Sequence, residues 1–134
     1  MLTGLYAACC ALLILALSLR IVSLRRRLRV GIGDGGDAGL ARAIRAQANA
    51  IEYVPLLLVM LLVAENDGAG TLFLHLCGAG LVLARVLHAV GLSGSAGTSF
   101  GRLWGTLLTW IVLLALSVQL TWRYVGAQMQ MIGQ

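Results

Sequence analysis

Four long, mostly apolar stretches dominate the chain, and short polar segments separate them. A helix needs about 20 such residues to cross the hydrocarbon core of a bilayer, and each stretch is long enough. Backbone groups find no water to bond with inside a membrane, so spanning segments of this kind fold as helices. The pattern therefore predicts one all-α, integral membrane four-helix bundle over residues 1–134, with helices at about 2–28, 41–66, 71–92 and 100–124.

Composition and charge favour a membrane protein and exclude ordinary soluble classes. Hydrophobic residues make up 60% of the chain and charged residues only 11%, whereas soluble domains carry about 25% charged residues. Four arginines directly follow the first apolar stretch, at Arg25, Arg26, Arg27 and Arg29. The net charge of +5 is therefore explained by orientation in the bilayer, and no nucleic-acid partner is predicted. The positive-inside rule places this arginine cluster in the cytoplasm and both termini outside.

Three other features are not expected to carry chemistry. An apolar run followed by positive charge reverses the order of a secretory signal, so the first helix is expected to be retained. The cysteines at positions 9, 10 and 77 lie within apolar stretches at spacings that match no metal motif, so no metal site is predicted. The loop GIGDGG at residues 31–36 formally matches a dinucleotide motif, but that motif requires a preceding strand rather than a membrane helix.

The second apolar stretch carries a polar stripe in its first half. The stripe consists of Arg42, Arg45, Asn49 and Glu52, which follow one another at intervals of three and four residues. This spacing places their side chains on one face of a helix. A charged side chain deep in a membrane helix costs about 2.5–3.5 kcal/mol on insertion scales, so such groups usually have partners or a function.

Further polar residues of the later helices fall in the same, cytoplasmic half: Arg85, His88 and Arg102. Arg85 is the expected direct partner of Glu52, because Arg45 lies seven residues away, about 10.5 Å along the helix axis. Gly101 and Gly105 form a G-x-x-x-G pair, which permits a close approach of the fourth helix to a neighbour. The segment from residue 126 to the end is expected to fray.

The run RAQANAIEYVPL, residues 45–56, resembles the second helix of the MAPEG family, the membrane-associated proteins in eicosanoid and glutathione metabolism. The family pattern is an Arg, an Asn four residues on, a Glu three further, then a Tyr and a nearby Pro. The matching residues are Arg45, Asn49, Glu52, Tyr53 and Pro55. The arginine-rich end of the first helix, together with Arg85 and Arg102, supports the match. The whole chain resembles the small bacterial inner-membrane branch of this family.

This resemblance implies a homotrimer that binds glutathione between neighbouring subunits on the cytoplasmic side. It implies a glutathione transferase- or peroxidase-like enzyme that acts on a hydrophobic electrophile. The residues implied in glutathione binding are Arg25, Arg45, Gln47, Asn49, Glu52, Tyr53, Arg85 and His88. Arg102 is implied as the catalytic residue, because a guanidinium near the sulfur favours the thiolate. The family's third-helix tyrosines correspond to His88 and Leu92, and a leucine cannot donate a hydrogen bond.

Three alternatives remain open. In the first, Glu52 belongs to a purely structural ion pair that locks the bundle. In the second, the chain is a non-catalytic ligand-binding or scaffold protein of the same fold, which Leu92 in place of a tyrosine supports. In the third, it is a small multidrug transporter; this reading is the weakest, because the arginines around Glu52 would repel cationic drugs.

Overall fold

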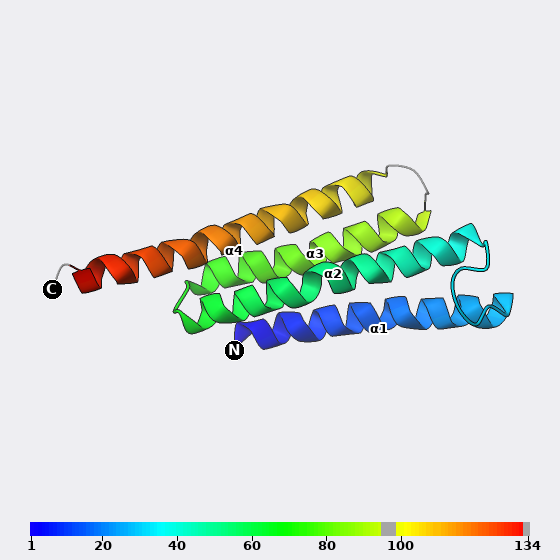
Figure 1. The fold of residues 1–134 in the computed structure, drawn as a ribbon, viewed down its shortest axis with the longest axis horizontal. Helices are drawn as coiled ribbons and strands as arrows, with labels where there is room; N and C mark the ends of the chain where they lie inside the picture. Colours follow the sequence, from blue (N-terminus) through cyan, green and yellow to red (C-terminus); the bar gives the residue numbers. More distant parts are fainter. Residues whose placement is uncertain (95–98, 133–134) are drawn as a thin grey trace.

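The computed structural model describes residues 1–94 and 99–132, and within them the chain forms four α-helices. These are α1 (Leu2–Leu28), α2 (Ala38–Asn66), α3 (Thr71–Gly94) and α4 (Phe100–Ile132). Figure 1 shows them running up and down, so that the start of α1 and the end of α4 lie toward the same end of the bundle. The predicted all-α four-helix bundle is confirmed. The loop predicted at residues 93–99 falls largely on 95–98, which lie outside the described residues.

All four helices are long and apolar enough to span a membrane. Large apolar side chains cover the outside of the bundle, for example Leu12, Leu72 and Leu114, each about two-thirds exposed or more. Soluble monomers rarely expose apolar surface on this scale, whereas a lipid-facing surface consists of it. The chain is therefore an integral membrane protein whose helices contact the bilayer.

Local sequence sets where α2 begins and where α4 ends. The Asp37 side chain accepts a hydrogen bond from the Leu40 amide at 2.7 Å and caps α2, which starts at Ala38 rather than near residue 41. The α4 helix continues to Ile132, so the expected fraying of the segment after residue 126 is wrong for the described residues. Alanine, glutamine and methionine, which favour helix, fill the stretch after Gly126, and no proline interrupts it.

The helices α2 and α3 form the middle of the bundle. The helix α1 packs on both of them, α4 packs on both of them from another side, and the described parts of α1 and α4 do not contact each other. The largest core cluster includes Val54, Leu57 and Leu61 of α2, Leu81 of α3 and Leu116 of α4. Polar side chains placed between α2, α3 and α4 are therefore shielded by this arrangement.

Gly101 and Gly105 bring α4 into close contact with α3. A Cβ atom added at Gly105 would lie 2.6 Å from the His88 amide nitrogen and 2.7 Å from the Ala84 carbonyl oxygen. A Cβ atom at Gly101 would lie 2.7 Å from the Leu87 carbonyl oxygen. These neighbours are backbone atoms, which cannot rotate away. The predicted role of the glycine pair in helix approach is thus confirmed.

Replacement of Gly105 by alanine is expected to destabilise the protein by about 1–3 kcal/mol, the usual cost of overpacking a tight contact. The clash with α3 outweighs the gain of about 1 kcal/mol that alanine brings to an ordinary helix interior. Thermal unfolding in detergent measures the change. Gly4→Ala is the matched control, because nothing lies within 4 Å of a Cβ at that helical glycine. Equal stability of the two variants would show that the α3–α4 contact is looser than the geometry at Gly105 indicates.

Contacts at the C-terminal end of α2 hold the start of α1 in place. The Glu65 carboxylate accepts hydrogen bonds from the backbone amides of Leu2 at 2.5 Å and Thr3 at 2.9 Å. These amides are unpaired donors at the start of α1, so a carboxylate from α2 satisfies them and meets the positive end of the helix dipole. The Tyr6 hydroxyl lies 2.6 Å from His75 Nδ1 and joins α1 to α3.

Candidate functional site

Arg85 on α3 is the centre of a hydrogen-bond network that joins α2, α3 and α4. Its side chain is only 2% exposed. Its Nη1 donates to Asn49 Oδ1 on α2 at 2.6 Å, and its Nη2 donates to the Gly105 carbonyl oxygen on α4 at 3.1 Å. The same Nη2 also donates to the Thr109 hydroxyl. A guanidinium buried in a membrane helix needs acceptors for its five donors, and two neighbouring helices supply three of them here.

Asn49 extends this network to the outer face of α2. Its Nδ2 donates to Glu52 Oε2 at 3.4 Å. Glu52 Oε1 in turn lies 3.1 Å from Arg45 Nη1 in a salt bridge, in which the arginine side chain is 62% exposed and the glutamate side chain 48%. The network therefore runs from a buried arginine on α3 to an exposed ion pair on α2.

The predicted direct pair between Glu52 and Arg85 is wrong. Among the described residues, Glu52 is bonded to Arg45 and Asn49, both on its own helix, and Arg85 bonds to Asn49 instead. Seven residues are almost two full helical turns, so Arg45 and Glu52 lie on the same face of α2. Two long side chains pointing toward each other can bridge the rise of about 10.5 Å between their backbones.

Tyr53 and Trp110 border the network between α2 and α4. The Arg85 Cζ atom lies 5.4 Å from the centroid of the Tyr53 ring, within the range of a cation–π contact. Trp110 Nε1 donates to the Tyr53 hydroxyl at 3.4 Å. These contacts hold the Tyr53 ring against the buried guanidinium. The structure thus brings together five of the predicted site residues: Arg45, Asn49, Glu52, Tyr53 and Arg85.

Three other predicted site residues make no hydrogen bond with this network among the described residues. Gln47 Nε2 donates to the Ser18 hydroxyl on α1 at 2.6 Å, so this side chain joins α1 to α2. His88 is 6% exposed, and its backbone lies close to α4 at Gly105. Arg102 lies exposed in the first turn of α4, where its backbone amide donates to Ser99 Oγ at 3.3 Å.

Arg25 lies at the end of α1, in an arginine-lined depression of about 410 Å³. The depression is lined by Val22, Arg25, Arg26, Arg29, Val30 and Gly31, and none of these residues is acidic. The Arg25 Nη1 atom is buried and has no hydrogen-bond partner among the described residues. A buried donor without an acceptor costs free energy, so this guanidinium is suited to an anion.

Thr109 and Trp110 belong to the network but were not predicted from the sequence. Thr109 is fully buried, and its hydroxyl also donates to the Gly105 carbonyl oxygen at 2.7 Å. It lies four residues after Gly105, and so on the same helix face as the glycine pair. That spacing was the available signal for Thr109. For Trp110, the sequence offered no signal beyond its depth in the helix.

Comparison of the sequence with known proteins identifies the family of this chain. The sequence profile of the MAPEG family matches residues 3–122, a range that contains every predicted site residue. Two relatives are both named inner membrane protein YecN, from Escherichia coli strain K12 and from Escherichia coli O6:H1 strain CFT073 / ATCC 700928 / UPEC. Each is 43% identical to this chain over 91 residues, which cover 68% of this chain and 70% of the relative. Through the family match over most of its length and its similarity to these proteins, the chain belongs to the MAPEG family.

Proposed function

We propose that this protein is a homotrimeric, glutathione-binding protein of the inner membrane. In this proposal it is a glutathione transferase- or peroxidase-like enzyme that acts on hydrophobic electrophiles, and its site lies between neighbouring subunits on the cytoplasmic side. Membership of the MAPEG family supports the class of function, and the name of the E. coli relatives supports the inner membrane.

One observation carries the proposal: the exposed ion pair of Arg45 and Glu52 lies in the first half of a membrane-spanning helix and extends to its middle. Glu52 is the fifteenth of the 29 residues from Ala38 to Asn66. In an isolated protomer this pair would face lipid, where charged groups are costly. A neighbouring subunit and a charged ligand would cover the pair and supply further hydrogen bonds. The pair is thus placed where a shared, polar site between subunits would need it.

Glutathione is complementary to this set of charges. It carries two carboxylates, one ammonium group and a thiol. Arg45 and Arg25 would hold carboxylates, because guanidinium and carboxylate groups form paired, charge-assisted hydrogen bonds. Glu52 would accept from the ammonium group, while Asn49 and Tyr53 would bond to the peptide groups. Arg85 and His88 would support these residues from the interior of the bundle, since both are buried.

Arg102 is the residue that we assign to the sulfur. Bound glutathione supplies the thiol that attacks an electrophile. Arg102 is exposed on its own protomer and opens α4, so its charge adds to the positive end of the helix dipole. Within a trimer it can extend toward a ligand held by the next subunit and favour the thiolate there.

The distribution of charge supports the orientation in this proposal. The arginine cluster after α1 lies at the end of the bundle opposite to Glu65 and Asp67. The positive-inside rule places the arginine end in the cytoplasm and both termini outside. The arginine-lined depression and Arg102 then face the compartment in which the glutathione substrate would be supplied.

The position of Leu92 favours a second candidate function, a non-catalytic ligand-binding or scaffold protein. Leu92 is 5% exposed and packs in a small core cluster with Leu17, Ala46 and Ala50. A tyrosine at this position would not fit without displacing α1 or α2. In that case glutathione would bind, but an electrophile would not be converted.

Calorimetric titration with glutathione tests the proposal on the purified protein in detergent or nanodiscs. We expect saturable heat at or below millimolar glutathione, with about one ligand per protomer, and a trimer in native mass spectrometry. Turnover of a hydrophobic electrophile would then separate the enzyme from the scaffold protein. No glutathione binding by a trimeric sample would refute the proposed ligand.

A further inference from the structure

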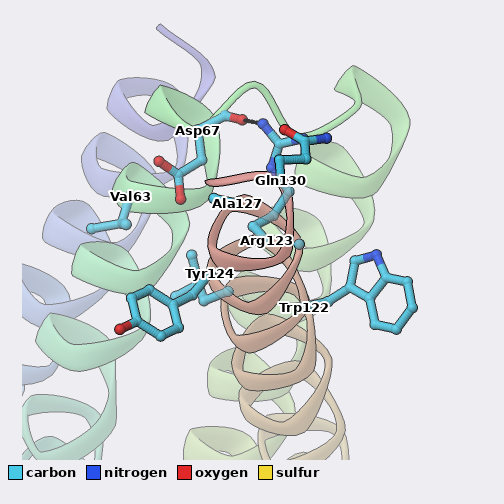
Figure 2. Close-up of a pocket in the computed structure, with 9 residues that line it drawn as sticks. Val63, Asp67, Trp122, Arg123, Tyr124, Ala127 and Gln130 are labelled. Carbon is cyan, nitrogen blue, oxygen red and sulfur yellow. Dashed lines mark hydrogen bonds between the residues drawn. The ribbon is translucent and has the colours of Figure 1, made fainter. Parts of the chain in front are cut away.

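The last part of α4 passes beyond the end of the bundle and forms one wall of a cavity there. The cavity has a volume of about 670 Å³. It is lined by Val63 and Asp67 from α2 and the turn after it, and by residues of α4 from Leu120 to Gln130. Figure 2 shows these side chains around the space between the turn and α4. A cavity of this size is within the range of about 300–1,000 Å³ that is typical of small-molecule sites.

The buried face of α4 changes character where the helix leaves the bundle. Within the bundle this face consists of Gly105, Thr109, Val112 and Leu116, which pack against α3 and α2. Beyond the bundle the same face continues at Arg123, Ala127 and Gln130, which line the cavity. If this end of α4 merely extended beyond its neighbours, its face would be expected to remain apolar or to become polar throughout. Instead, the hydrogen-bonding side chains of Arg123 and Gln130 lie on either side of the small residue Ala127.

The cavity holds one positive and one negative group that are not paired with each other. Arg123 Nη2 donates to the backbone carbonyl oxygen of Asp67, not to its carboxylate. Among the described residues, no ion pair or hydrogen bond engages the Asp67 carboxylate. Figure 2 shows this carboxylate on the Val63 side of the cavity and the Arg123 side chain on the Gln130 side. The site is therefore complementary to a ligand that carries an anion and a cation a short distance apart.

The cavity lies at the depth of the lipid headgroups. The α4 helix has 33 residues, or about 50 Å of length, whereas the hydrocarbon core is about 30 Å thick. Trp122 and Tyr124 are largely exposed beside the cavity, and such residues gather where a membrane meets water. Val63 and Leu120, in the membrane-spanning helices, form its apolar part. This combination favours a lipid over a soluble molecule.

We propose that this cavity binds a phospholipid whose headgroup carries a phosphate and a primary ammonium group. The Arg123 guanidinium binds the phosphate, with Gln130 beside it, and the Asp67 carboxylate accepts from the ammonium group. The acyl chains lie along Val63 and Leu120. The site is independent of the proposed glutathione site, because Glu52 and Asp67 are 15 residues apart, about 22 Å along α2 and its following turn.

Native mass spectrometry of the full chain, with equal amounts of three added lipids, tests this site. The lipids are phosphatidylethanolamine, phosphatidylcholine, whose ammonium has no N–H donor, and phosphatidylglycerol, which has no ammonium group. We expect phosphatidylethanolamine to be retained about tenfold over the other two, the factor of one charge-assisted hydrogen bond. Asp67→Asn should reduce this preference to near unity, while Arg123→Gln should lower the retention of all three lipids.

Arg27→Gln is the matched control, since Arg27 is an exposed arginine outside both cavities. It should leave the preference for phosphatidylethanolamine unchanged. Asp67→Asn preserves the backbone carbonyl that Arg123 contacts, so a lost preference in this variant is not explained by a rearranged turn. Equal retention of the three lipids by the unaltered protein, or an unchanged preference in Asp67→Asn, would overturn the proposal. Displacement of the lipid by millimolar soluble phosphoethanolamine would overturn the choice of a lipid as the ligand.

Discussion

Replacement of Arg85 by methionine is expected to lower the stability of this protein by about 3 kcal/mol, or roughly 10 °C in Tm. The substitution removes the donors for Asn49, for the Gly105 carbonyl and for Thr109, all at a position that is 2% exposed. It also removes a buried charge, which by itself favours the variant. The loss outweighs this gain, because removing one member of a buried polar network leaves the other members without partners.

Thermal unfolding in detergent, followed by circular dichroism, measures this effect. Arg85→Lys keeps the charge but not the planar fork that reaches two helices at once, so an intermediate loss is expected. Arg27→Met is the control for removal of an exposed arginine and should change Tm by little. If Arg85→Met were as stable as the control, the network would not contribute to holding α2, α3 and α4 together.

Replacement of Arg45 and of Arg102 by alanine should impair glutathione chemistry in two different ways. Arg45→Ala should weaken glutathione binding by about 10- to 100-fold, because a charge-assisted clamp on a carboxylate is worth about 1.5–3 kcal/mol. Arg102→Ala should leave most of the binding but remove the ultraviolet absorbance of the bound thiolate, since the positive charge near the sulfur is lost. Calorimetry and difference absorbance measure the two effects separately.

Two further variants guard against indirect effects. Arg45→Lys preserves the ion pair with Glu52 but not paired bonding to a carboxylate, so weaker binding in this variant points to the clamp rather than to a disturbed helix. Arg27→Ala removes a nearby arginine outside the site and should alter neither signal. Thiolate absorbance that survives in Arg102→Ala would exclude Arg102 from the catalytic role.

The sequence alone was sufficient for the helices and for the polar stripe on α2. Backbone groups in a bilayer must bond within their own segment, so four such apolar stretches fold as helices. Their approximate ends follow from length and hydropathy except for the end of α4, which continues to Ile132. The shared face of Arg45, Asn49 and Glu52 follows from the 3.6-residue period of any α-helix. The Gly101–Gly105 pair also indicated a close helix contact correctly, because two helices can approach this closely where glycine leaves room for the neighbouring backbone.

Tertiary structure decided which groups meet across helices. The sequence favoured Arg85 as the partner of Glu52, but Arg85 bonds to Asn49, and Gln47 points to Ser18 on α1. Such choices depend on how far each helix is rotated about its axis and shifted against its neighbours. Those two quantities result from the packing of many side chains at once, so no spacing along one helix contains them.

The cavity beyond the bundle shows the same division. Trp122 and Arg123 are visible in the sequence as an aromatic and polar end of the last helix, whereas Gln130 lies in the segment that was expected to fray. The sequence does not show that α4 continues past the turn at Asp67. That depends on the relative lengths and offsets of α2 and α4 once they pack. Helical period and hydropathy are properties of a segment and can be read locally, whereas a site formed between segments exists only after their relative positions have been set by packing.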